Sequence, residues 1–368
     1  MSRSSAHLAS RLVFPLLLGA ALFIAACGGD NGSTTPTTPL TEPVPKPHAV
    51  SPYKLKTFKG VPPAGATQPD DLAVSANDAD LWVGYGNGVD TTGKSGSSTL
   101  VEYDISSTNV LRSISIPGHL DGLKINPATN EVWTTENEDG NPTLAVVDPN
   151  TGGFQTFSFA SGLVTGGMDD LVFTLASPPQ VFIVTSSQTD ITLPVIVQVT
   201  GEPAANNLQV VPFLPGNPAS VLNVVTNTVE TSDQIGDPDS MTLDPAGELV
   251  LDNRSDDSLY IVNPSVAGPV RRVPLTLNGG PVEVNDTIFT TSTFGVTSTA
   301  GAGVIFITDT SANLIYMLTK PFFPANEAYT AANIVNDIGL VDLSTGVVTP
   351  VVTGFEGLHG LAYMPTAP

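Results

Sequence analysis

Short apolar runs alternate with turn residues along most of the chain. The runs are rich in Val, Ile, Leu and Thr, and clusters of Gly, Pro, Asn and Asp separate them. No window places apolar residues at the spacing of an amphipathic helix. The pattern therefore predicts an all-β fold of short strands.

The strands form a repeat. Six apolar runs begin alike, with an acid, or once a His, two residues before an apolar side chain. These positions are Asp70, Asp121, Asp169, Asp239, Asp286 and His359. They lie 51, 48, 70, 47 and 73 residues apart, and the regular units hold four short strands each. Four strands in a unit of about 48 residues are typical of a β-propeller blade. The sequence predicts a propeller with six blades, with five or seven as alternatives.

The C-terminal units are less regular. The strand-like segments 286–292, 304–310 and 314–320 are assigned to the fifth blade, and residues 321–337 are interpreted as an insertion over one face. A closed ring requires the segments 53–58 and 359–364 to share the last blade, which the strands within 338–354 would complete.

The N-terminal segment has a different character. Arg3 and Arg11 precede an apolar run from Leu12 to Ala26, which is short for a membrane-spanning helix and is typical of a secretory signal. The run ends in "IAAC", and its Cys27 is the only Cys in the chain, which excludes an intrachain disulfide. The alternative is a signal cleaved elsewhere, with an incidental Cys.

The "IAAC" segment resembles the lipobox of bacterial lipoproteins. The resemblance implies that Cys27 carries a lipid and begins the mature chain, and that Gly28 directs it to the outer membrane. We therefore expect a signal peptide at 1–26, a Thr- and Pro-rich tether at 27–47 and a propeller domain at 48–368. The expected location is the cell envelope, facing the periplasm or the cell surface.

Composition narrows the range of partners. The chain has 368 residues, of which 41% are hydrophobic and 13% charged, and its formal net charge is −22. Nucleic acid is excluded as a partner because phosphate binding needs clustered basic residues. The remaining candidates are the membrane, reached through the lipid, and an envelope protein or small molecule.

The units resemble the NHL repeat in "LHGLAYMP", "PDSMTLDPAGELVLDNRSDDSLYIV" and "VIFITDTSANLIYML". They are also similar to the six-bladed, calcium-dependent lactonases of the SMP-30/gluconolactonase group and to streptogramin lyase-like propellers, whose "WFTE" strand resembles "VWTTEN". The lactonase resemblance implies a metal bound by Asp239. Asp70 replaces the Glu of that group, and Asp121 in "LDGL" replaces the Asn of its "NGL" start.

Equivalent positions on inner propeller strands converge at one mouth of the central channel. We therefore expect the five acids and His359 to form a site for calcium or another divalent cation, because such ions prefer oxygen ligands. In the alternative interpretation each acid caps the turn that enters its strand. Second-tier candidates end the second strands of their units: Glu136, Asp252 and Asp309.

Candidates for catalysis are few. His119, His359 and Asp239 are the candidate acid–base residues, although His119 is expected in a solvated turn. Trp82 and Trp133 occupy matching places and are expected to pack between blades.

Two functions from different classes follow. The first is a lipid-anchored, non-catalytic binding or scaffold protein with an acidic mouth. The second is a metal-dependent lactonase or esterase, and elimination of the streptogramin lyase type is a distant third. The chain lacks the Glu that the lactonase group carries at the position of Asp70, and it lacks that group's "NGL" start. Both absences favour the first function.

Overall fold

A computed structural model describes residues 46–75, 77, 79–159, 162–186, 188, 190–200, 207–266, 268–290 and 301–365. They belong to one compact unit, Pro45–Pro368. The predicted signal peptide, Cys27 and nearly all of the predicted tether lie outside the described residues. No helix in the described ranges is long and apolar enough to cross a membrane.

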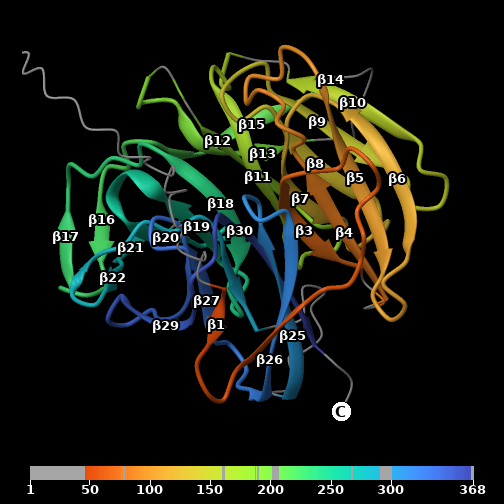
Figure 1. The fold of residues 1–368 in the computed structure, drawn as a ribbon. Coiled ribbons are helices and arrows are strands. Elements are labelled where there is room, and N and C mark those ends of the chain that lie inside the picture. Colours follow the sequence, from red (N-terminus) through yellow and green to blue (C-terminus); the bar gives the residue numbers. More distant parts are fainter. Residues whose placement is uncertain are drawn as a thin grey trace, which may run out of the picture. The chain divides into compact units, whose positions relative to one another are not determined.

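Hydrogen bonding groups the described strands into six sheets, numbered here from the N-terminal side (Figure 1). Sheet 1 contains β3 (Pro69–Val74), β4 (Asp80–Tyr85), β5 (Ser97–Asp104) and β6 (Val110–Pro117). Sheet 2 contains β7 (Leu120–Ile125), β8 (Val132–Glu136), β9 (Thr143–Val147), β10 (Phe154–Phe159) and the short parallel strand β14 (Asn207–Leu208). Sheet 3 contains β11 (Gly167–Phe173), β12 (Val181–Ser186), β13 (Pro194–Val199) and β15 (Val210–Pro215).

The other three sheets carry additions at their outer edges. Sheet 4 contains β18 (Pro238–Leu243), β19 (Leu249–Asn253), β20 (Ser258–Val262), β21 (Val270–Pro274) and the hairpin of β16 (Val221–Asn223) and β17 (Thr228–Glu230). Sheet 5 contains β24 (Thr287–Phe289), β27 (Ala328–Ala332), β28 (Asp337–Asp342), β29 (Val347–Thr353), β22 (Thr276–Leu277), β23 (Gly280–Pro281) and β1 (His48–Ala49). Sheet 6 contains β30 (Leu358–Pro365), β25 (Gly301–Asp309), β26 (Leu314–Phe323) and β2 (Lys54–Thr57).

The first strand of each sheet lines a central axis, and these inner strands contact one another in a closed ring: β3, β7, β11, β18, β24 and β30. One apolar cluster fills each junction between neighbouring sheets. Both faces of most strands are therefore buried, which explains their nearly continuous apolar runs. The prediction of an all-β propeller is confirmed.

The two Trp residues lie where the repeat predicts. Trp82 is buried among apolar residues of sheets 1 and 2, and Trp133 packs edge-on against Phe173 between sheets 2 and 3, with ring centroids 5.2 Å apart. Large aromatic side chains fill the wedge between splayed sheets. The expected packing between blades is confirmed for both.

The predicted order of strands in the last two units is wrong. The hairpin β25–β26 follows β24 in sequence but pairs with β30 in sheet 6. The innermost partner of β24 is β27, which lies within the segment 321–337 that was interpreted as an insertion. The strands within 338–354 also belong to sheet 5 and not to the last sheet. β27 was missed because its sequence, AYTAA, contains small side chains that resemble a loop.

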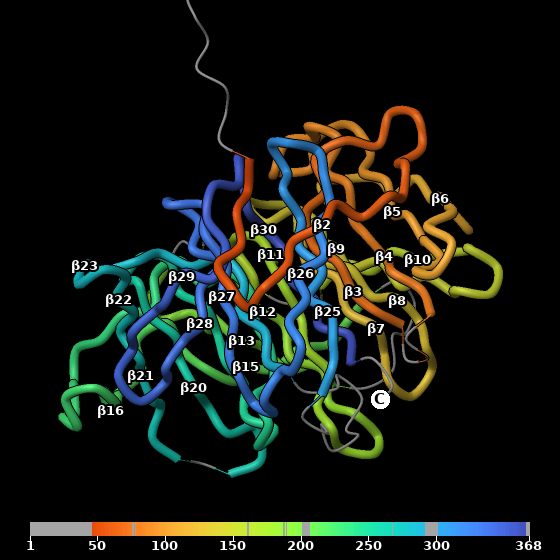
Figure 2. The backbone as a smooth tube through the Cα atoms, turned by 60° about the horizontal axis from the view of Figure 1, so that its bottom comes forward, coloured from red at the N-terminus to blue at the C-terminus, as the bar shows by residue number. Residues whose placement is uncertain are grey.

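The N-terminal segment closes the ring. β2 pairs antiparallel with β26, so the segments 53–58 and 359–364 share sheet 6, as predicted (Figure 2). Tyr53, just before β2, shares a hydrogen bond of 2.9 Å with Tyr329 of sheet 5, and the ammonium of Lys320 lies between their rings. Because β1 pairs with β29, the same segment ties sheets 5 and 6 together.

Neighbouring inner strands lie close together at Gly122 on β7. A Cβ at this position would lie 2.4 Å from the carbonyl oxygen of Asp169 and 2.5 Å from Cα of Asp170. Gly122→Ala is therefore expected to lower the free energy of unfolding by about 1–3 kcal/mol, because the backbone at Asp169 and Asp170 must move to make room for the methyl group. Urea unfolding measures the loss. Gly268→Ala is the control, since its nearest neighbour would be 3.8 Å away, and equal losses in the two variants would contradict the prediction.

Candidate functional site

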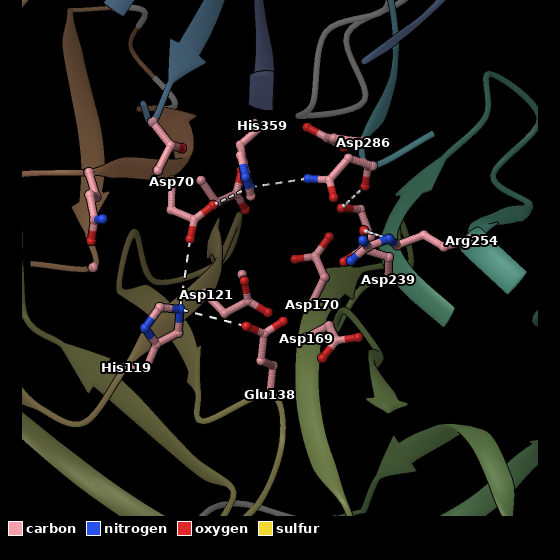
Figure 3. Close-up of a pocket in the computed structure, with 18 residues that line it drawn as sticks. Asp70, His119, Asp121, Glu138, Asp169, Asp170, Asp239, Arg254, Asp286 and His359 are labelled. Atoms are coloured by element: carbon pink, nitrogen blue, oxygen red, sulfur yellow. Dashed lines mark hydrogen bonds and ion pairs between the residues drawn. The ribbon is translucent and has the colours of Figure 1, made fainter. Parts of the chain in front are cut away.

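A cavity of about 250 Å³ opens at the end of the axis where the inner strands begin (Figure 3). Its lining is mainly acidic and includes two imidazoles and one guanidinium. The charged lining residues are Asp70, Asp71, His119, Asp121, Glu138, Asp169, Asp170, Asp239, Arg254, Asp286 and His359. Six of these are the repeated positions of the sequence, so the structure brings all six to one mouth.

Two successive residues of an inner strand can line the cavity because the strand begins with an irregular register. In a regular strand Asp70 and Asp71 would point to opposite faces. The pairing of β3 with β4 shifts between Pro69 and Leu72, and the same shift occurs at the start of β7, β11 and β18. The irregularity creates two tiers of side chains, an upper tier at the mouth and a lower tier beneath it.

The upper tier is centred on Asp121. One oxygen of Asp121, one of Asp70 and a ring nitrogen of His119 lie within 4.8 Å of one another. Asp121 forms a second such group with Glu138 and Asp169. Oδ2 of Asp121 is buried and accepts no hydrogen bond from the described residues. Two overlapping sets of ligand atoms thus share one carboxylate.

The ring of His119 is held in place by the backbone of Val89. Its Nδ1 lies 3.0 Å from the carbonyl oxygen of Val89, so in the neutral ring Nδ1 donates and Nε2 keeps its lone pair. Nε2 faces Asp70 and Glu138 at 3.9 and 3.8 Å. A backbone carbonyl on the remote ring nitrogen is the usual support for a metal-ligating His. The expectation of a solvated turn is wrong, because this side chain is only 13% exposed.

On the opposite side of the upper tier His359 pairs with Asp70. Nδ1 of His359 lies 2.9 Å from Oδ1 of Asp70 and 3.3 Å from Nδ2 of Asn285. Burial disfavours the charged ring, but Asp70 outweighs this and raises the pKa of His359 to about 9. Burial also opposes the charge of Asp70, yet the two imidazoles bring its pKa below the ordinary value. These two residues form an ion pair at neutral pH.

Among the described residues, no other upper-tier acid has a cationic partner as close as His359 is to Asp70. Burial, followed by the charges of Glu138, Asp169 and other neighbouring acids, raises the pKa of Asp121 well above its ordinary value. Burial and the charges of Asp239 and Glu138 do the same for the pKa of Asp169. Arg254 lies 3.9 Å from Asp239 but closer to Glu283, at 3.0 Å. The tier therefore holds more acidic groups than its cations can balance.

The lower tier is fully engaged with the protein. Asp71, Asp170 and Asp286 each accept a backbone N–H from the next inner strand, donated by Leu123, Met241 and Leu361 at 2.7, 2.9 and 2.6 Å. These acids occupy sheets 1, 3 and 5, and smaller residues take the equivalent place in sheets 2, 4 and 6: Gly122, Ser240 and Gly360. These hydrogen bonds therefore join the sheets in three pairs: 1 with 2, 3 with 4, and 5 with 6.

The ammonium of Lys124 is the cation of the lower tier. Its Nζ lies 3.1 Å from Oδ2 of Asp71 and 2.8 and 2.9 Å from the two oxygens of Asp170. Asp286 also raises the pKa of this ammonium through its charge. Charge-assisted hydrogen bonds of this length keep the lysine protonated.

The sequence analysis treats Asp286 as equivalent to Asp70, but the structure places it in the lower tier. Its Oδ2 caps Leu361 as the lower-tier acids cap their neighbours, and Asn285 occupies the place equivalent to Asp70 and His359. The doublet Asn285–Asp286 offers two polar residues in succession, and the strand period alone does not distinguish them.

The three candidates of lower priority, Glu136, Asp252 and Asp309, are buried but do not line the cavity. Asp309 caps a turn by accepting the N–H groups of Glu356 and Gly357 at 3.1 and 2.9 Å. Asp252 accepts from Thr287 at 2.9 Å, and Glu136 from Thr143 at 2.5 Å. These contacts fix local turns and neighbouring strands and do not involve the cavity.

Sequence reasoning missed several lining residues. Glu138 and Arg254 lie on connections between strands and carry no repeat signal. Asp71 and Asp170 directly follow the candidate acids Asp70 and Asp169. These two "DD" doublets are the sequence signal that could have identified them. Lys124, two residues after Gly122 on β7, was also missed; it does not line the cavity, and its pairing with two other sheets depends on the closed ring.

Comparison with known proteins gives only distant structural matches. No family model and no curated protein matches the chain. Among solved structures it is similar to a protein of unknown function from Desulfotomaculum acetoxidans, with 13% identity, a TM-score of 0.46 and coverage of 81% of this chain and 76% of the other. Virginiamycin B lyase from Staphylococcus aureus matches with 12% identity, a TM-score of 0.45 and coverage of 84% and 92%. A protein of unknown function from Bacteroides caccae matches with 11% identity, a TM-score of 0.46 and coverage of 81% and 87%.

At these identities the likeness does not extend to an activity or a ligand. The resemblance to NHL-repeat and SMP-30 proteins stays a prediction from the sequence.

Proposed function

We propose that the propeller binds a divalent cation at its acidic mouth, with ligands from Asp70, His119, Asp121, Glu138 and Asp169. The observation that carries this proposal is the carboxylate of Asp121, which belongs to both groups of ligand atoms and has a buried oxygen that no described residue hydrogen-bonds. A buried carboxylate among like charges is costly unless a cation offsets the repulsion. Mainly oxygen ligands suit calcium or a similar hard ion.

The alternative, that the repeated acids are turn caps, fits the lower tier better than the upper. Asp71 and Asp170 each accept two backbone N–H groups. In the upper tier, Oδ2 of Asp121 and Oδ2 of Asp239 accept no hydrogen bond from described residues, and Asp239 is only 8% exposed. Capping and cation binding are thus divided between neighbouring residues of the same strands.

In this proposal the chain is a cell-envelope protein, anchored to a membrane through a lipid on Cys27, and the bound cation forms part of a recognition surface. The proposed cation ligands line the cavity of about 250 Å³, which is large enough to hold a small polar group of a partner protein or ligand beside the cation. An acidic mouth excludes anions unless the cation is present, so ligand binding would depend on the metal.

The first test is the metal content of purified protein, together with its melting temperature in calcium and in EDTA. We expect about one divalent ion per chain and a lower melting temperature in EDTA. Asp121→Asn is expected to abolish both effects, because it removes the shared ligand. Asp148→Asn is the matched control, since it removes one charge from an exposed turn of sheet 2. An absence of ion and of any EDTA effect in millimolar calcium would contradict the proposal.

A second candidate function is metal-dependent hydrolysis of a lactone or ester. The favouring observation is His119, whose anchored ring presents Nε2 to the same cavity as the proposed cation. The metal would polarise the carbonyl of the substrate. A screen of lactones and esters with and without calcium tests this candidate, and turnover unaffected by Asp121→Asn would refute it.

A further inference from the structure

Asp239, at the start of β18, has a buried carboxylate oxygen, Oδ2, that no described residue hydrogen-bonds. The residue is only 8% exposed and lines the mouth cavity (Figure 3). The cation paired with it is Arg254, whose Nε lies 3.9 Å from Oδ2. That nitrogen has a single hydrogen, which it donates to Oε1 of Glu283 at 3.0 Å. Asp239 therefore presents to the cavity an acceptor that the described part of the chain leaves unused.

Two hydroxyl groups of the same cavity also offer only lone pairs to a ligand. Oγ of Ser240 donates its hydrogen to the carbonyl oxygen of Asn285 at 2.5 Å, and Oγ1 of Thr310 donates to that of Pro69 at 2.6 Å. A hydroxyl has one hydrogen and two lone pairs, so both oxygens remain as acceptors. Together with Asp239, these hydroxyls suit a ligand that donates hydrogen bonds.

Charge favours a cationic donor over a neutral one. The cation proposed for the mouth would bind the two groups of ligand atoms around Asp121, and Asp239 belongs to neither group. The cationic side chains of the mouth, Arg254 and His359, each lie within 3.0 Å of another acid. Burial raises the pKa of Asp239 well above its ordinary value, because its charged form is poorly solvated. A positively charged ligand would offset that cost.

We propose that the mouth binds a small primary amine, with the carboxylate of Asp239 as the partner of its ammonium group and the hydroxyls of Ser240 and Thr310 as further acceptors. An ammonium has three hydrogens, and its hydrogen bond to a carboxylate is charge-assisted. The cavity of about 250 Å³ is large enough for a molecule of a few non-hydrogen atoms. The inference goes beyond the proposed cation site and does not depend on it, because Asp239 is outside that ligand set.

The test is calorimetric titration of the purified protein, in EDTA, with ethanolamine, ethylene glycol and glycolate. These probes are similar in size and differ in charge. We expect ethanolamine to bind at least about tenfold more tightly than the other two, because a hydrogen bond between charged groups is stronger than a neutral one. Asp239→Asn is expected to remove this preference. Asp148→Asn is the matched control and is expected to keep it, since that acid lies in a turn of sheet 2 and does not line the cavity.

Thr310→Val is a second variant, which keeps the shape of the side chain and removes one acceptor. It is expected to weaken ethanolamine binding about two- to tenfold, the range for one neutral hydrogen bond. An unchanged affinity in Thr310→Val together with an unchanged preference in Asp239→Asn would overturn the inference.

Asp121→Asn separates the amine subsite from the proposed cation site. Ethanolamine binding that survives Asp121→Asn and is lost in Asp239→Asn supports the amine subsite, whether or not the protein holds calcium. A preference for ethanolamine that Asp121→Asn removes and Asp239→Asn retains overturns the inference, because the ammonium then occupies the place proposed for the metal. Equal affinity for the three probes, a preference for glycolate or an absence of binding overturns it as well. Bound calcium per chain judges the cation site by itself, so either proposal can fail alone.

Discussion

Asp170→Asn is expected to lower the free energy of unfolding by about 3–5 kcal/mol, the range for breaking a buried and hydrogen-bonded ion pair. Both oxygens of Asp170 accept backbone N–H groups, from Leu171 at 2.7 Å and from Met241 at 2.9 Å, and both also accept from Lys124. An amide offers one acceptor where the carboxylate offers two, so its NH₂ group would face an N–H donor.

Two penalties combine in this variant. One buried backbone N–H loses its partner, and the ammonium of Lys124 loses one of its two closest carboxylates. The hydrogen bond that joins sheets 3 and 4 at Asp170 and Met241 would be lost. Urea unfolding followed by far-ultraviolet circular dichroism measures the loss.

Asp121→Asn is the matched control for Asp170→Asn. Both change an acid of an inner strand to its amide, but Asp121 lies in the upper tier among like charges. In EDTA the Asp121→Asn variant is expected to be at least as stable as the wild type, because removal of a buried charge relieves repulsion. If both variants lose stability equally, the division into capping and binding tiers is wrong.

In EDTA the protein is expected to be more stable at pH 5 than at pH 8 by several kcal/mol. Burial raises the pKa of Asp252 to about 8 and that of Glu136 to about 7, from ordinary values of 3.8 and 4.5. Burial, with the charge of Asp170, raises the pKa of Asp71 to about 6. Each pKa unit corresponds to about 1.4 kcal/mol between folded and unfolded states.

The sign follows from proton linkage. For an acid whose pKa is raised on folding, the folded state binds more protons than the unfolded state between the two pKa values. The stabilisation is full below about pH 4 and is lost as pH rises through the folded values of about 6 to 8. Many exposed acids shift the other way at low pH, which is why the comparison begins at pH 5.

Thermal or urea unfolding at each pH unit from 5 to 8 tests this prediction. Asp252→Asn is expected to flatten the profile between pH 6 and 8, because it removes the group with the pKa of about 8. Its Oδ1 can still accept from Thr287. A stability that rises with pH over this range in EDTA would contradict the assignment of buried, protonated acids.

The repeat explains how much of the fold was accessible from sequence. The four-stranded units of sheets 1 to 4, the packing of Trp82 and Trp133, and the closure by residues 53–58 all follow from local patterns. The exchange of β25–β26 with β27 between sheets 5 and 6 does not. Each of these strands satisfies the same period of two, and the choice of partner depends on which edges lie side by side.

The candidate site shows the same division. Recurrence at the start of each unit was enough to predict that Asp70, Asp121, Asp169, Asp239 and His359 meet at one mouth. It was not enough to place Asn285 and Asp286 in their tiers, because the irregular start of an inner strand lets successive side chains face the axis. Glu138 and Arg254 come from connections that the repeat does not constrain.

The sequence by itself determined that this protein is a ring of short-stranded sheets with an acid at the head of most inner strands, because spacing and side-chain alternation are properties of the chain. Only the tertiary structure decided which acids are capped and which are not. That decision depends on distances across the ring, such as those from Lys124 to Asp71 and Asp170, between residues about 50 positions apart in sequence. Closure of the ring sets these distances, and no local pattern contains them.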